Sequence, residues 1–262
     1  MDTQPIEYFV ITKEELRRLL NEVADNPTAA DNFWDRFGYK IDLVSKNYSQ
    51  AKARLMFLLH QAQAIDPEAY TRCHKGTPFY WLGTIAFLQN DYQTATFFFD
   101  AAVSEDIRKS EHPVINSTPA TYFLTLDGEQ PYQAAQDLVR DSQAKVQRTL
   151  DFYNGLTGKP GGIPNFTIES LRDKFLRRAL TPGNHELCTL ATTFISFFIE
   201  WDIHNEFFDI RPGDGTAEPF FLHLFKGCVL FESLLKANPV NPPYVDTLGP
   251  ALNHLYRNLG IA

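Results

Sequence analysis

The chain has 262 residues, of which 44% are hydrophobic and 14% aromatic, a composition typical of a globular protein with a substantial core. Its formal net charge of −8 at pH 7 excludes a generally basic surface for nucleic acid or an anionic membrane. Cys73, Cys188 and Cys228 lack Cys-x-x-Cys spacing and lie in apolar helical patterns, which predicts reduced thiols in a cytoplasmic protein without a secretory signal.

Apolar residues recur at helical spacing from the start of the chain. Thr12 and Glu15 form a capping box, which predicts that a helix begins at residue 13 and ends near residues 26–27. A second helix is predicted over residues 28–38. A third is predicted over residues 48–65, where apolar residues again fall three and four apart.

The most specific pattern lies in residues 76–107, which we predict to form two short antiparallel helices joined by a turn. On each helix, apolar residues at spacings of three and four share one face. Gly83 and Ala95 are small where the helices would cross, so the two backbones can approach closely. Asn90 and Asp91 suit the turn, because their side chains can hydrogen-bond nearby backbone and tolerate unusual dihedral angles.

The rest of the chain is predicted to be helical as well. A helix pair is expected at residues 119–127 and 130–153, followed by a boundary in the Gly- and Pro-rich segment 154–165. The later helices are predicted at 167–180, 185–208, 219–236 and 244–259. The apolar run inside 185–208 is too short for a membrane span. Two adjacent helices as apolar as 185–208 and 219–236 must cover each other or a partner.

Residues 76–107 resemble a tetratricopeptide repeat, a helix–turn–helix unit of roughly 34 residues. The residues that match its pattern are Phe79, Leu82, Gly83, Tyr92, Ala95, Phe99 and Ala102. Ala86 and Ile107 depart from it, because the family carries tyrosine and proline there. Weaker echoes occur at 48–67 and 119–150. The resemblance implies an all-α protein with tetratricopeptide-like helical hairpins in residues 1–154 and a compact C-terminal helical bundle in residues 166–262.

The resemblance also implies binding of a peptide or a protein helix in the groove that the first helices of such repeats line. Its candidate binding residues are Phe79, Tyr80, Thr84 and Phe87. Exposed aromatic surface on such a face would give affinity through buried area, with polar neighbours fixing the register. We therefore interpret the chain as a scaffold or adaptor module for a protein or peptide partner, with no membrane partner.

The alternative interpretation is an enzyme. Arg178 and His185 have an Rx6H spacing that resembles the motif of HEPN-domain ribonucleases, helical bundles that cut RNA without metal. His185 would act as general acid or base and Arg178 would stabilise charge on the phosphate, in a site doubled across a homodimer. Arg54 and His60 show a similar spacing, and Ala179 stands where the family carries a polar residue. The sequence leaves open whether the chain is an enzyme.

Other chemistry lacks a specific motif. The sequence contains no GxSxG, HExxH, GxxxxGK[ST] or GxGxxG pattern, and we expect no cofactor and no metal. Glu200 and His204 lie one helical turn apart, and His223 and Cys228 lie five residues apart on an apolar helix. Surface pairing and packing are the predicted roles of these residues, with metal ligation as the alternative.

Overall fold

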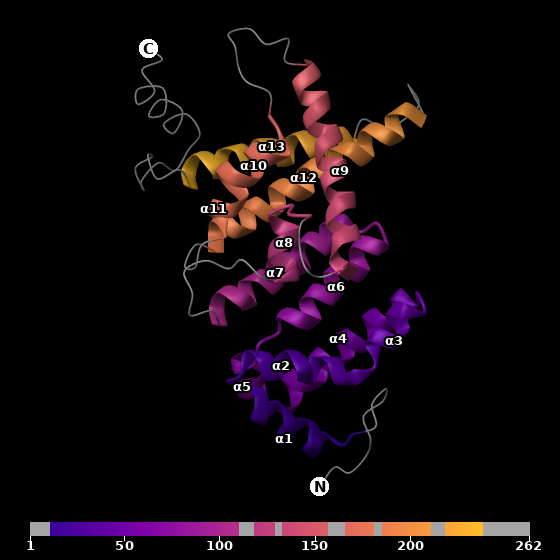
Figure 1. Cartoon of the computed structure of the whole chain (residues 1–262), viewed down its shortest axis with the longest axis vertical. Coiled ribbons are helices and arrows are strands. Elements are labelled where there is room, and N and C mark those ends of the chain that lie inside the picture. The colour runs from indigo at the N-terminus through magenta and orange to yellow at the C-terminus, as the bar shows by residue number, and fades with distance from the viewer. Residues whose placement is uncertain are drawn as a thin grey trace. The chain divides into compact units, whose positions relative to one another are not determined.

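The computed structural model describes residues 11–109, 118–128, 133–156, 166–180, 185–210 and 218–237. These residues form helices joined by turns, and the described part of the chain contains no β-strand (Figure 1). The predicted all-α class is therefore confirmed. The helix predicted at residues 244–259 lies outside the described residues.

The chain divides into two compact units, residues 1–121 and 122–262. The boundary predicted at residues 154–165 instead falls inside the second unit, because α9 (Gln133–Leu156) packs against α12 (His185–Ile210). The N-terminal region predicted for residues 1–154 would contain most of α9. A Gly- and Pro-rich segment predicts a break in helix, but it cannot show whether the helices on its two sides pack together.

The first unit is built around a core enclosed by α1, α2, α4 and α6. Of these helices, α1 contacts α2 and α4, and α6 contacts the same two. Its largest fully buried side chains include Trp34, Phe33 and Leu58. Thr12 caps α1 as predicted, because its hydroxyl oxygen accepts a hydrogen bond from the Glu15 amide at 3.2 Å. The helices of this unit are α1 (Lys13–Val23), α2 (Pro27–Trp34), the 3₁₀ turn η1 (Asp35–Phe37), α3 (Tyr39–Val44), α4 (Tyr48–Ile65), α5 (Pro67–Arg72), α6 (Gly76–Leu88) and α7 (Tyr92–Lys109). The division between the units falls within α8 (Pro119–Leu124).

The predicted hairpin is present as α6 and α7, whose contact is the most extensive between any two described helices. The chain reverses at Asn90, which has a φ of +61°. A side-chain oxygen of Asp91 then accepts a hydrogen bond from the Thr94 amide at 3.1 Å and so caps the start of α7. A Cβ atom on Gly83 would lie 2.9 Å from the Phe99 ring. The predicted close approach at Gly83 is confirmed, whereas the assignment of the hairpin to the tetratricopeptide family stays a prediction.

The second unit is arranged around α12, which contacts α9, α11 and α13. Its other helices are α10 (Ile168–Leu171), the π-helical stretch η2 (Arg172–Leu176), α11 (Arg177–Ala179) and α13 (Glu218–Ala237). Two polar contacts join α9 to α12: the Thr149 hydroxyl donates to the Phe198 carbonyl at 2.8 Å, and Arg148 donates to both oxygens of Asp202 at 2.7 and 2.6 Å. Among the described residues, no helix has both the length and the apolar character that crossing a membrane requires.

Replacing Gly83 with alanine tests the close approach of α6 and α7. The added methyl group would overlap the Phe99 ring and lie 3.2 Å from the Ala95 carbonyl oxygen, so the helices must move apart. We expect the free energy of unfolding, measured by urea denaturation, to fall by about 1–3 kcal/mol. Gly155→Ala is the control, because a Cβ at Gly155 of α9 meets nothing within 4 Å. It should leave stability unchanged or raise it by up to about 1 kcal/mol. Equal stability of Gly83→Ala and wild type would contradict the role of Gly83.

Candidate functional site

The residues predicted to line a peptide groove are mostly buried. Tyr80, Thr84 and Phe87 are 8%, 7% and 5% exposed, and Phe79 is half-buried. The Tyr80 ring lies against the Phe99 ring at 5.7 Å between centroids, and the Thr84 hydroxyl donates to the Tyr80 carbonyl at 3.0 Å. This differs from the groove expected from the sequence. The physical reason is that α6 carries buried residues on all sides. The face that was expected to line the groove is therefore packed against the protein and is not open to a ligand.

The two residues of the predicted ribonuclease motif lie on neighbouring elements. Arg178 is exposed on α11, and His185 is the first residue of α12, which contacts α11. The side chain of His185 and residues 181–184 lie outside the described part of the chain. Convergence of the two side chains therefore stays a prediction.

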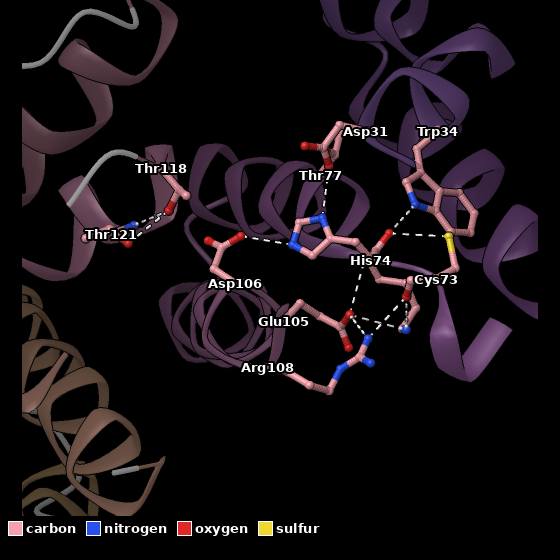
Figure 2. A network of polar contacts seen from close by, with 11 residues as sticks. Asp31, Trp34, Cys73, His74, Thr77, Glu105, Asp106, Arg108, Thr118 and Thr121 are labelled. Carbon is pink, nitrogen blue, oxygen red and sulfur yellow. Dashed lines mark hydrogen bonds and ion pairs between the residues drawn. The ribbon is translucent and has the colours of Figure 1, made fainter. Parts of the chain in front are cut away.

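A buried polar cluster in the first unit joins α2, α7 and the turn before α6 (Figure 2). The His74 side chain, 7% exposed, lies between two carboxylates, with Nδ1 3.1 Å from Asp31 and Nε2 3.0 Å from Asp106. Burial alone would lower the pKa of His74, but hydrogen bonds and charge from Asp106 and Asp31 outweigh it and raise the pKa to about 9. His74 is therefore an imidazolium ion paired with two carboxylates at neutral pH.

This cluster contains a thiol, an imidazole and carboxylates, the groups of a cysteine nucleophile with its base, but they are not arranged for that chemistry. The Cys73 thiol points to the His74 carbonyl at 3.6 Å, and burial raises the pKa of Cys73 to about 12. Cys73 therefore stays a protonated thiol at neutral pH. Both ring nitrogens of His74 already contact carboxylates, and the Trp34 indole donates to the His74 carbonyl at 2.6 Å. The cluster instead holds α2, α7 and the turn before α6 together.

The second unit contains an apolar pocket of about 450 Å³ between α9, α12 and α13. Its lining is dominated by aromatic rings from all three helices, and no lining residue is an Asp, Glu, Lys or Arg. The lining residues are Thr149, Phe152, Tyr153, Phe197, Phe198, Trp201, Phe220, His223, Leu224, Gly227, Cys228 and Phe231. Ligand-binding pockets in proteins have this mostly apolar character with a few placed polar groups.

The walls of the pocket are held by a close approach of α12 and α13. A Cβ atom on Gly227 would lie 3.0 Å from two atoms of the Phe197 ring, so the glycine allows α13 to reach this ring. Phe197 in turn stacks on His223, with 4.0 Å between ring centroids and 12° between planes. On the α9 side, Phe152 contacts Trp201 at 5.4 Å between centroids. The spacing of apolar residues in the sequence predicted these helices. It could not indicate that a cavity remains between their aromatic rings.

His223 is the unusual polar group of this pocket. Its side chain is 5% exposed, and neither ring nitrogen has a hydrogen-bond partner among the described residues. The nearest Glu200 oxygen lies 3.9 Å from Nδ1, beyond hydrogen-bond distance. Burial, followed by the neighbouring His204, lowers the pKa of His223 to about 4, so the ring is neutral at pH 7. A buried polar group without a partner is destabilising by about 1–3 kcal/mol, and such a group in a native structure requires an explanation.

Glu200 is neutralised by other groups. One of its oxygens accepts hydrogen bonds from the Ser196 hydroxyl at 2.8 Å and the Lys226 ammonium at 2.7 Å. Within the described ranges, no three His, Cys, Asp or Glu side chains gather closely enough to hold a metal ion. Metal ligation by Glu200 and His204 is the alternative that the sequence offers; in the structure Glu200 pairs with Lys226 at 2.7 Å.

A second surface feature of α13 is a run of large apolar side chains that face solvent. We define the α13 stripe as Phe221, Leu222, Phe225 and Val229, which are 68%, 62%, 69% and 47% exposed. Phe221, Phe225 and Val229 are four residues apart and so lie on one side of the helix. Single exposed apolar residues are common, whereas a contiguous exposed group is typical of interaction surfaces. The sequence indicated this feature only as a helix too apolar to stand uncovered.

Comparisons of the chain with protein-family models, with curated protein sequences and with solved structures gave no match. The function must therefore be inferred from the residues themselves. Two features of α13, the pocket and the stripe, carry that inference.

The protein should become less stable at alkaline pH, because His74 loses its proton. Its folded-state pKa of about 9 lies above the ordinary value of 6.5, so its contribution is complete below pH 6.5 and is lost as pH rises through 9. We expect a loss of roughly 2–4 kcal/mol between pH 6 and 9.5 in urea denaturation. Asp106→Asn should be less stable at pH 6 and show a smaller loss. If both proteins lose the same free energy over this interval, the His74 pairing is not its cause.

Proposed function

We propose that the protein is a non-enzymatic interaction module and that its partner binds the α13 stripe with the apolar face of a helix. The observation that supports this proposal is the exposure of 47–69% at four large apolar side chains on one helix. The proposal keeps the interaction role that the sequence suggested. It places the binding surface on α13, because the α6 residues expected to bind are mostly buried.

The chemistry of the stripe favours an apolar partner. Removing a phenylalanine side chain from water contributes about 1.5–3 kcal/mol, so Phe221 and Phe225 alone could supply much of a binding free energy. Burial of large aromatic side chains is also what dominates measured interface energies. The charged side chains described on this part of α13 are already paired: Lys226 with Glu200 at 2.7 Å, and Lys236 with Glu232 at 2.9 Å.

The shape of the stripe favours a helix as the partner element. Phe221 to Val229 covers two turns of α13, or about 12 Å at a rise of about 1.5 Å per residue. A partner helix meets such a stripe with apolar residues spaced three, four and seven apart. The described part of the chain has no strand whose edge could accept a partner strand, which is the other common mode of peptide recognition.

A labelled model peptide tests this proposal. The probe is an amphipathic helix of leucine, alanine, glutamate and lysine with all leucines on one face, and its control is a peptide of the same composition with scattered leucines. We expect only the first peptide to bind in fluorescence anisotropy. Phe221→Ser and Phe225→Ser should each weaken binding roughly tenfold or more, because each removes an aromatic anchor.

Phe97→Ser is the matched control, since Phe97 on α7 is 66% exposed, close to the 69% of Phe225. Equal weakening by Phe97→Ser, or no weakening by either stripe substitution, would contradict the proposal. Light scattering after size-exclusion chromatography tests whether a second copy of this chain covers the stripe instead. A dimer of this chain that Phe225→Ser dissociates would assign the stripe to a second copy and overturn the proposal of a different partner.

A further inference from the structure

We propose that the pocket between α9, α12 and α13 binds an uncharged, ring-bearing apolar small molecule that presents one neutral hydrogen-bonding group to His223. This site is distinct from the α13 stripe and does not depend on the partner proposed for it. The inference stands on the volume of the pocket, on the absence of charge in its lining and on the unsatisfied ring nitrogens of His223.

The volume fits a small molecule. At about 450 Å³ the pocket falls within the range of about 300–1,000 Å³ in which proteins bind drug-sized ligands. Side chains that line an empty cavity lose the dispersion contacts that close packing would give them. A ligand would restore these contacts along three helices at once. Leu224 and Phe231, which are 63% and 52% exposed, lie at the mouth of the pocket and leave an entry from solvent.

The lining selects against charge. Glu200 and Lys226 are the charged groups nearest to His223, and they already pair with each other at 2.7 Å. A carboxylate, phosphate or ammonium in the pocket would lose its hydration without gaining an ionic partner, which is strongly unfavourable. Aromatic rings such as Trp201 and Phe152 favour another ring, which they can contact edge-to-face or in an offset stack. The expected ligand is therefore neutral and contains at least one ring.

His223 specifies the polar group of that ligand. Because its pKa is lowered to about 4, the ring at neutral pH has one N–H donor and one bare nitrogen acceptor. Neither has a partner among the described residues. The Thr149 hydroxyl, which also lines the pocket, already donates to the Phe198 carbonyl at 2.8 Å. Both ring nitrogens are themselves buried, and the ring is stacked on Phe197. A turn of the His223 side chain out of this stack would bring one nitrogen to a hydroxyl, amine or carbonyl of the ligand and give it the partner that the protein does not supply.

Titration with the neutral fluorescent probe 1-aminoanthracene tests the pocket. We expect saturable enhancement of fluorescence with wild-type protein. Leu224→Glu should weaken binding at least tenfold, because it places a carboxylate at the mouth. Leu88→Glu is the matched control: Leu88 on α6 is 48% exposed, and it belongs neither to the pocket lining nor to the α13 stripe. Equal loss in both variants, or no loss with Leu224→Glu, would overturn the proposal.

A second measurement needs no substitution in the lining. Cys228 lines the pocket and is exposed, whereas Cys73 and Cys188 are buried, so a thiol reagent should modify Cys228 first. Saturating 1-aminoanthracene should slow that modification several-fold in the wild-type protein. The Cys228→Ser variant identifies the modified thiol. Unchanged reactivity of Cys228 in the presence of bound probe would place the probe elsewhere and overturn the pocket assignment.

The role of His223 is tested by comparing 1-aminoanthracene with 1-methylanthracene, which has a similar size but no hydrogen-bonding group. Wild type should bind the amine roughly three- to tenfold more tightly, the effect of one hydrogen bond. His223→Phe should remove this preference while it retains binding of the methyl compound. If the wild-type protein binds both compounds equally, His223 does not recognise a polar group on the ligand.

Discussion

The structure depends on two glycines that allow an aromatic ring to lie against the backbone of a neighbouring helix. At Gly83 of α6 the ring is Phe99, and an added Cβ would meet it at 2.9 Å. At Gly227 of α13 the ring is Phe197, and the corresponding distance is 3.0 Å. Interiors are packed so densely that one methyl group at such a crossing forces a rearrangement. In the first unit this contact holds α7 against α6, whereas in the second unit it positions one wall of a cavity.

Two buried histidines show how different surroundings give the same residue different roles. The side chains of His74 and His223 are 7% and 5% exposed, yet the pKa of His74 is raised to about 9 and that of His223 is lowered to about 4. Two carboxylates compensate the burial of His74, and its charge helps to hold α2, α6 and α7 together. No such compensation exists for His223 among the described residues. The burial of His74 is explained by its contribution to stability. For the burial of His223 we propose ligand binding as the explanation.

Much of the fold could be predicted from the sequence because helix signals are local. The Thr12 cap, the turn at Asn90 and the small residue at Gly83 depend on near neighbours in the chain, and the structure confirms each of them. The packing partner of α9 depends instead on contacts made across the chain. For the same reason the sequence could not show that Tyr80 is buried, since α6 is apolar on every side and its spacing does not tell which side meets solvent.

The pocket and the α13 stripe were harder to predict, because both consist of side chains that lack packing partners within the protein. The apolar pattern of α13 is typical of a helix buried on all sides. In the structure its residues have three different surroundings: Leu230 and Leu235 are buried, His223, Leu224 and Phe231 line the pocket, and the α13 stripe faces solvent. An apolar helix with only one side packed is unfavourable unless something else covers the remaining sides. That imbalance, more than any motif, supports our two proposals: a partner on one side of α13 and a small molecule on another.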